Sequence, residues 1–263
     1  MADQAVMSSP KPGGGKFLSV VIYILLIIIV LELVFHLAIA PKLVIRNIRV
    51  ETSLDIAKED VLRIAGVAGD DYFFSVKPGT VKENLERYAL VKRAEVERIF
   101  PDTLNIVLIP RKPVTAAFVE TEGSNQLLVF DEDGVAFERW STGDAGTLPI
   151  LSGIQFENFN VGDRLPQPLL DTMRELKTLR LEKPALYQTL SEISFSRGRG
   201  NELDITVYPV HKPVKLLFGP RMTAELLHSA LRLMSVLERN GVIEPGSEID
   251  FRFGDVIYRK QGE

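Results

Sequence analysis

The side chains best suited to metal or acid–base chemistry are three histidines, and the chain contains no cysteine. His36 lies in a long apolar run, His211 lies between two prolines, and His228 lies in a stretch with helical periodicity. These positions do not reproduce the short spacings at which histidines and cysteines bind zinc. The sequence therefore predicts no metal site.

A Ser-x-x-Lys pattern, Ser8 to Lys11, has the residue types of a nucleophile and its lysine base. It lies in a short tail rich in Gly, Pro and Ser, where no pocket can lower the pKa of the lysine, so we interpret it as a chance match. The sequence has no Gly-x-Ser-x-Gly motif. We therefore expect a protein that is not an enzyme, with no catalytic residue and no cofactor.

Two loops carry charges that could bind an ion. Gly198-Arg199-Gly200 could hold a phosphate, but a flexible turn between two strands is the favoured interpretation. The carboxylates of Asp131, Glu132 and Asp133 could hold a cation, but a solvated surface turn is favoured there.

A long apolar run dominates the N-terminal part of the chain. Residues 17–40 form a 24-residue stretch in which Ser19, Glu32 and His36 are the clearly polar residues. As a helix it would be about 36 Å long, against about 30 Å for the hydrocarbon core of a bilayer. Ala38-Ile39-Ala40 offers a signal-peptidase site, but the run is longer than a signal peptide needs, and a proline follows it. We expect an uncleaved transmembrane helix.

The flanking charges do not decide the orientation of this helix, because basic residues lie on both sides of it. Length favours one topology: residues 1–16 are too few to fold, whereas residues 41–263 form a long domain that is translocated regardless of its flanking charge. We expect a cytoplasmic tail and an exported C-terminal domain, a single-pass type II arrangement in the bacterial inner (plasma) membrane. The net charge of −4 makes nucleic acid an improbable partner.

Glu32 and His36 are ionisable groups at membrane depth, where such groups are costly. They are four residues apart, so they share one helix face and can hydrogen-bond each other. One interpretation is that they do only this or reach the outer interface. The other is that they contact the helix of a partner protein.

The first 70 residues after the apolar run predict a β-α-α-β-β order. A strand is predicted at 43–51, a helix capped by Asp55 and stopped at Gly66, and a second helix opened by the capping box at 80–83. Two strands then follow at 91–99 and 103–109, joined by a tight turn.

This order resembles the POTRA domain of the FtsQ/DivIB cell-division family. The resemblance rests on an aromatic-Pro-Asp turn at Phe100-Pro101-Asp102, an Ile/Leu-rich strand after it, and then Arg111-Lys112-Pro113-Val114. Two positions depart from the family pattern: Phe100 replaces the usual Trp, and Pro110 replaces the usual Glu. Because Pro110 lacks a backbone donor, we expect a bulge or a strand edge there.

The resemblance continues to the end of the chain. A hairpin with an Asp-Gly turn is predicted at 127–137, and Leu148-Pro149-Ile150-Leu151-x-Gly153 is similar to the segment that follows it in the family. A helix is then predicted after Pro166 and Pro168, followed by strands at 190–196, 203–208 and 214–218 and a helix at 223–240. A final hairpin is predicted with strands at 249–253 and 256–260.

The fold class expected is α+β, with a transmembrane helix, a POTRA domain and a mostly antiparallel β domain with packed helices. The expected domains are a cytoplasmic tail (1–16), the helix (17–40), the POTRA domain (43–113) and the β domain (114–263). The family resemblance implies a divisome scaffold at the division septum that binds FtsB/DivIC and FtsL. It also implies a docking edge made of Phe251, Arg252, Phe253, Val256, Ile257 and Tyr258.

Other interpretations remain open at this point. Phe251 and Phe253 could simply be core residues. A POTRA-bearing factor of outer-membrane protein assembly or secretion also uses strand addition, although here one POTRA domain is predicted and no barrel follows. A tethered periplasmic enzyme would need a pocket that gathers titratable groups.

Overall fold

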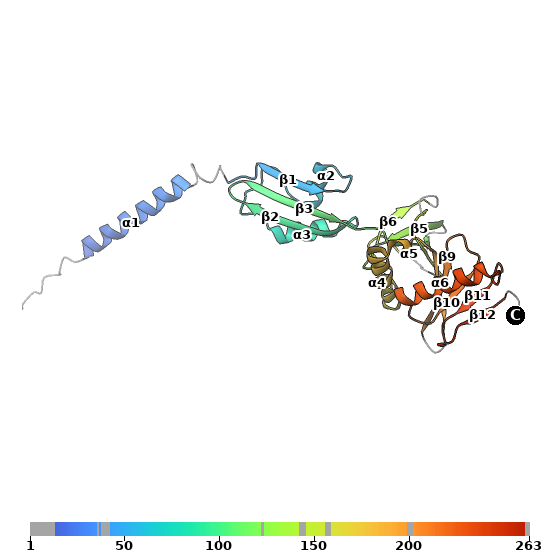
Figure 1. Ribbon diagram of the computed structural model, residues 1–263. Coiled ribbons are helices and arrows are strands. Elements are labelled where there is room, and N and C mark those ends of the chain that lie inside the picture. The colour runs from blue at the N-terminus through green and yellow to red at the C-terminus, as the bar shows by residue number, and fades with distance from the viewer. Residues whose placement is uncertain are drawn as a thin grey trace, which may run out of the picture. The chain divides into compact units, whose positions relative to one another are not determined.

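The computed structural model of the 263-residue chain describes residues 14–35, 37, 43–121, 124–141, 146–155, 159–198 and 202–260 (Figure 1). Beyond the first helix, the described residues contain a three-stranded sheet and a nine-stranded sheet. The chain divides into two compact units, one of residues 1–85 and 94–108 and the other of residues 86–93 and 109–263. The predicted α+β class is confirmed for these residues.

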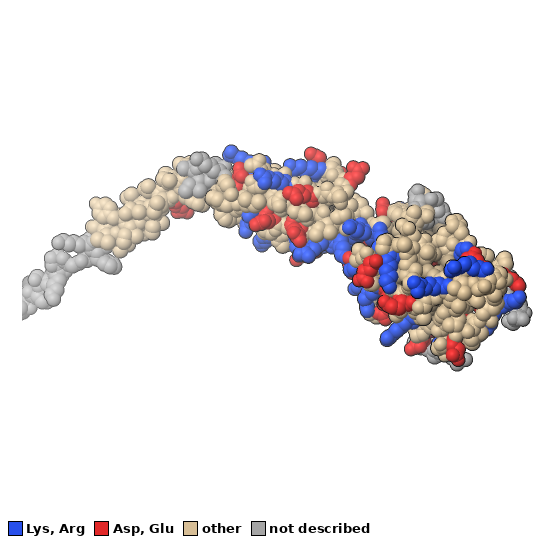
Figure 2. Space-filling model, viewed as in Figure 1, with Lys and Arg blue, Asp and Glu red and all other residues tan. Residues whose placement is uncertain are grey.

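Helix α1 (Gly14–Val34) carries apolar side chains around its circumference, and those from Leu18 to Val34 are exposed. In Figure 2 the visible face of this helix is almost free of charged side chains. Nevertheless, no helix within the described residues is long and apolar enough to cross a membrane. The membrane-spanning helix predicted for residues 17–40 is therefore not found, and residues 36 and 38–40 of that range lie outside the described part of the chain.

The first unit contains a three-stranded sheet in the order β1-β3-β2, formed by β1 (Asn47–Thr52), β2 (Val91–Ile99) and β3 (Thr103–Pro110). β1 is parallel to β3. Helices α2 (Lys58–Ala65) and α3 (Pro78–Glu86) each bury one apolar face. The core is a set of fully buried side chains from both layers, including Val61, Leu85, Ala94, Leu104 and Ile106.

Three details of this unit differ from the sequence prediction. β1 begins four residues later than predicted, because the backbone of residues 43–46 hydrogen-bonds to residues 71–73 and to Asp102 instead of to a strand. Asp55 does not cap α2, whose N-cap is Ala57 without a side-chain hydrogen bond. α3 begins at Pro78 rather than at the capping box, which agrees with the preference of proline for the first turn of a helix.

The second unit is built on a nine-stranded sheet in the order β12-β11-β10-β9-β8-β7-β4-β5-β6. Five of the strand pairs in this sheet are antiparallel (β12–β11, β10–β9, β9–β8, β4–β5, β5–β6) and three are parallel (β11–β10, β8–β7, β7–β4). The sheet is therefore mixed but mostly antiparallel, as predicted. The strands are β4 (Thr115–Thr121), β5 (Ser124–Phe130), β6 (Ala136–Trp140), β7 (Ile150–Ser152), β8 (Leu190–Arg197), β9 (Leu203–Pro209), β10 (Lys215–Phe218), β11 (Glu248–Asp250) and β12 (Ile257–Arg259).

Helices α4 (Gln167–Glu182), α5 (Pro184–Tyr187) and α6 (Ala224–Arg239) pack on one face of this sheet (Figure 1). Their apolar faces and the inward side chains of the strands form one large core. A smaller cluster around Leu127, Val129 and Phe137 lies on the opposite face of the sheet, because Leu128 and Phe130, which alternate with them on β5, belong to the large core. The Oγ1 atom of Thr223 caps α6 by accepting a hydrogen bond from the N–H of Leu226.

Candidate functional site

The candidate site is the β12 end of the large sheet, where the last strand of the chain lies (Figure 1). β12 is antiparallel to β11, with Glu248 opposite Arg259, Ile249 opposite Tyr258 and Asp250 opposite Ile257. Within the described residues β12 has no strand on its other side. An edge strand of this kind presents unpaired N–H and C=O groups to solvent.

The backbone groups that face outward can be identified from the register. The carbonyl of Ser247 and the N–H of Phe251 both bond to β10, so the odd-numbered residues of β11 direct their backbone N–H and C=O groups to β10. The backbone groups of Glu248 and Asp250 therefore point to β12, and those of their partners Arg259 and Ile257 point back to β11. Tyr258, between them, directs its N–H and C=O to the free edge.

Three of the six predicted docking residues present apolar side chains to solvent. The exposed fraction is 53% for Phe253, 49% for Val256 and 38% for Ile257. An apolar cluster beside an open strand edge gives an added strand both main-chain hydrogen bonds and side-chain contacts. These three residues fit the predicted role in binding.

Phe251 and Tyr258 serve the fold instead with their side chains. Phe251 packs against the core and stacks on Phe218, with the ring centroids 5.6 Å apart. The hydroxyl of Tyr258 donates to the carbonyl oxygen of Val242 at 2.6 Å and lies 2.8 Å from the hydroxyl of Ser247. The alternative that Phe251 is a core residue thus fits the structure, whereas Phe253 lies outside the core.

Arg252 holds the end of the sheet together. Its Nε and Nη2 atoms donate to the two carboxylate oxygens of Asp250 at 2.9 and 2.8 Å, and its Nη1 donates to Asp204 on β9 at 2.9 Å. Asp250 is fully buried and also accepts from Arg259 at 3.2 Å. The Arg252 hydrogen bonds hold the pKa of Asp250 below its usual range and raise the pKa of Arg252.

The predicted final hairpin is shorter than expected, because residues 251–256 form an irregular turn between two three-residue strands. Arg252 lies in this turn and closes it through Asp250. Sequence reasoning did not identify the roles of Asp204 and Asp250, although the Asp250-x-Arg252 spacing is a signal that could have revealed part of this network.

Glu32, the other predicted interaction residue within the described part of the chain, is exposed on α1. It lines a shallow apolar hollow with Ile28, Leu31, Val34 and Phe35. His36 lies outside the described residues, so the predicted pairing of Glu32 with His36 is not tested.

The acidic turn at residues 131–133 is neither a free cation site nor a simple solvated turn. Asp131 is fully buried, accepts from the N–H groups of Asp133 and Val135, and pairs with Arg111 at 2.5 Å. Lys92 pairs with Glu132 and, at 2.9 Å, with Asp133. The hydrogen bond from Lys92 is the main cause that lowers the pKa of Glu132. These carboxylates are already occupied by protein cations.

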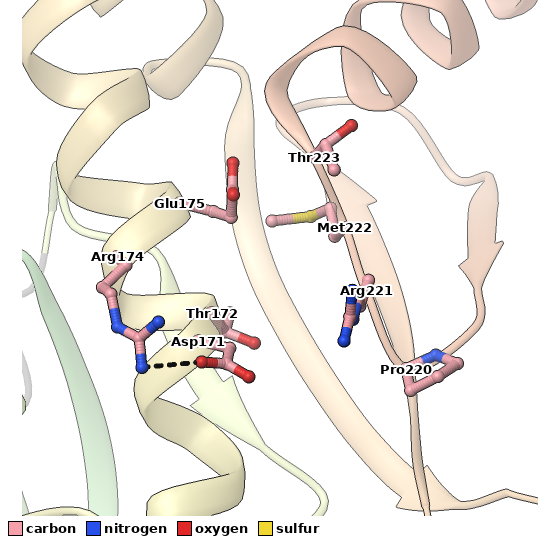
Figure 3. A pocket seen from close by; sticks show the side chains of 8 residues that line it. All are labelled: Asp171, Thr172, Arg174, Glu175, Pro220, Arg221, Met222 and Thr223. Atoms are coloured by element: carbon pink, nitrogen blue, oxygen red, sulfur yellow. Dashed lines mark ion pairs between the residues drawn. The ribbon is translucent and has the colours of Figure 1, made fainter.

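A cavity of about 390 Å³ lies between α4 and the segment before α6 (Figure 3). Arg174 turns to Asp171 and pairs with it at 2.8 Å, while Met222 is buried and the hydroxyl of Thr223 is used as a helix cap. Among the described residues that line this cavity, no serine, cysteine or histidine stands beside a base. No cluster of three potential metal ligands occurs in the described ranges of the chain.

The fold defines the class of protein: a POTRA-type domain followed by a sheet domain in which β12 is an edge strand among the described residues. Residues 43–109 match the family described as POTRA domain, FtsQ-type.

Curated relatives align with both parts of the chain. A cell division protein FtsQ of Geobacter sp. (strain M21) is 28% identical over 64% of this chain and 60% of the relative. A cell division protein FtsQ of Geotalea daltonii is 25% identical over 82% of this chain and 75% of the relative. A cell division protein DivIB of Bacillus cereus is 27% identical over 80% of this chain and 73% of the relative. The chain thus spans less than two thirds of the Geobacter protein.

The family match and these relatives support the FtsQ/DivIB family for this chain and confirm the resemblance predicted from its motifs. All three relatives are named as cell division proteins.

Proposed function

We propose that this chain is a non-enzymatic divisome scaffold that recruits and holds FtsB/DivIC and FtsL during septum formation. The observation that carries the proposal is the β12 edge, where the backbone of Tyr258 faces outward beside three exposed apolar side chains. A partner segment would add as a tenth strand along β12 and cover Phe253, Val256 and Ile257. Phe251, Arg252 and Tyr258 would support this surface from the core side.

The proposed arrangement is a cytoplasmic tail (1–16), a helix in the inner membrane (17–40), an exported POTRA domain (43–113) and an exported β domain (114–263). The exposed apolar circumference of α1 supports the anchor, because such a helix needs a lipid or protein cover. The position of the POTRA match directly after this segment agrees with the same arrangement.

Glu32 and His36 are proposed to contact the membrane helix of a partner. The support is the carboxylate of Glu32 among the apolar side chains of the second half of α1, a placement that is costly in lipid. The double variant Glu32→Leu, His36→Leu should insert normally but co-purify less partner, and Ile29→Leu is the matched control. Unchanged co-purification of the partner would remove this part of the proposal.

The strand-addition proposal is tested by replacing single backbone amides with esters. An ester at Tyr258 removes the outward N–H and keeps the side chain. Tyr258→Pro would remove both. The loss of one hydrogen bond should weaken the binding of purified FtsB/DivIC by about 2- to 12-fold. The thermal transition should stay in place.

The matched control is an ester at Ile257, whose N–H faces β11. It should lower the thermal transition and keep the outward N–H of Tyr258 in place. If both esters leave the affinity unchanged, the partner does not add to β12.

A further inference from the structure

A second exposed apolar surface lies in the first unit, far along the chain from β12. It consists of Tyr72, Phe74 and Phe100, with exposed fractions of 36%, 54% and 69%, and we call it the aromatic patch. Its residues come from the loop before α3 and from the turn after β2. Large aromatic side chains clustered in this way mark an interaction surface.

The aromatic patch is a built surface, because its rings are held by a buried one. Phe73, 4% exposed, contacts the ring of Phe74 at 5.2 Å and that of Phe100 at 6.1 Å, both edge to face. Tyr72 contacts Phe74 at 5.8 Å. The guanidinium of Arg98 lies 5.5 Å from the centre of the Phe73 ring and donates to the carbonyl oxygens of Phe73 and Val76.

The aromatic patch is fixed at the point where the chain enters this unit. The N–H of Phe73 donates to the carbonyl of Leu43 at 2.8 Å, and Val44 forms a bridge with Tyr72. From Leu37, the last described apolar residue after α1, to Leu43 there are six residue steps, which span at most about 22 Å. However the two parts are arranged, Leu43, whose carbonyl accepts from Phe73, lies within this distance of Leu37.

We infer that the aromatic patch inserts into the interface of the lipid bilayer that holds the apolar helix. This inference rests on the proposed membrane anchor and adds a second contact to it. Aromatic rings favour the headgroup region of a membrane because they combine apolar area with a polar or polarisable edge. The inserted rings would keep the POTRA domain against the membrane surface.

Apolar burial rather than charge should drive this contact. Two carboxylates, Asp71 and Asp102, lie beside the aromatic patch in the sequence and accept hydrogen bonds from the N–H of Ala68 and from the side chain of Asn47. The guanidinium of Arg98 lies over the buried Phe73 ring and donates to the carbonyl oxygens of Phe73 and Val76. With two carboxylates and one guanidinium, these groups do not attract anionic lipid. Insertion should therefore occur in zwitterionic bilayers and persist at high salt.

The test uses the full chain in phosphatidylcholine vesicles and tryptophan as a depth probe. Trp140 is the single native tryptophan, so Trp140→Phe gives a chain without tryptophan fluorescence. Three variants then carry one probe each: Phe100→Trp in the aromatic patch, Phe118→Trp as a matched control of 45% exposure in the second unit, and Leu26→Trp in α1. Emission is compared between vesicles without bromine and vesicles with bromine on the lipid chains, placed near the headgroup for positions 100 and 118 and near the chain ends for position 26.

Quenching and a blue shift at position 100, unchanged by salt and absent at position 118, are the expected result. Quenching at position 26 without quenching at position 100 would overturn the inference and leave the anchor intact. No quenching at position 26 would overturn the anchor and the inference with it. Quenching at position 100 only with anionic lipid, or shielding only after a partner protein is added, would also overturn the inference.

Discussion

Replacement of Arg252 by alanine should destabilise the second unit, and it also removes the guanidinium that lies 5.2 Å from the centre of the exposed Phe253 ring. The change removes two hydrogen bonds to Asp250 and one to Asp204, and it leaves a fully buried carboxylate with Arg259 and one backbone N–H as its remaining donors. Breaking a buried ion pair costs about 3–5 kcal/mol. Because the Arg252 side chain is 25% exposed and Asp250 keeps other donors, we expect about 2 kcal/mol.

Thermal unfolding at neutral pH measures this effect. For a unit of this size, about 2 kcal/mol corresponds to a decrease in Tm of roughly 4–8 °C. Arg197→Ala, at an exposed arginine on β8, is the matched control and should change the free energy of unfolding by less than about 0.5 kcal/mol.

The effect should also depend on pH in a defined direction. The pKa of Asp250 is lower in the folded chain than in the unfolded chain, mainly because Arg252 donates to it. The pair therefore stabilises the fold fully above the unfolded carboxyl pKa of about 4, and this contribution is lost as pH falls through the folded value. The difference in Tm between wild type and Arg252→Ala should shrink as pH falls from 7 toward 3. Equal differences at both ends, or none at pH 7, would refute the role given to Arg252.

Three further predictions concern other parts of the second unit. The double variant Phe253→Ser, Ile257→Ser should weaken partner binding in a titration and leave Tm nearly unchanged; a large drop in Tm would mean that these side chains are core. Tyr187→Phe should lower the free energy of unfolding by about 1 kcal/mol in denaturant, because the Tyr187 hydroxyl donates to the buried carbonyl of Val114 at 2.6 Å. Burial also raises the pKa of this tyrosine to about 12, so titration of its phenol near pH 10 would contradict the buried position. Gly153→Ala should yield little folded protein in a solubility assay, because φ is +78° at this residue and a Cβ would lie 2.0 Å from a carbonyl oxygen of β8. A normal yield of soluble protein would contradict this close approach.

Local sequence patterns were sufficient to predict a helix or strand where one face of that element is buried. β2 spans residues 91–99, as its alternation predicted, and α6 lies within the predicted 223–240 with Gly241 at a positive φ after it. In both elements the apolar side chains recur at the period of the structure, so the pattern alone identifies the element.

The pattern failed where both faces are buried or where tertiary contacts dominate. β4 was not predicted, because Thr115, Ala116 and Ala117 at its start are all buried and give no polar alternation there. β7 is only three residues long and is defined by its two neighbours in the sheet.

The candidate site shows the same division. The family motifs directed attention to the end of the chain, and β12 does lie at a sheet edge. Which residues of that segment stabilise the fold and which are exposed depends on Asp204, which is distant in sequence, and on the hydrogen bonds between β10 and β11. Neither is visible in the order of residues 251–258.

The most direct test of the central claim is a photo-crosslinker at Val256 in living cells, with the captured chains identified by mass spectrometry. The same crosslinker at Phe118, similarly exposed but away from β12, is the control. Capture of small single-span cell-division proteins of the FtsB/DivIC or FtsL type at position 256, and not at position 118, is the predicted result. Capture of outer-membrane assembly or secretion components at position 256, or equal capture at both positions, would contradict the proposal that β12 is the docking edge of a divisome scaffold.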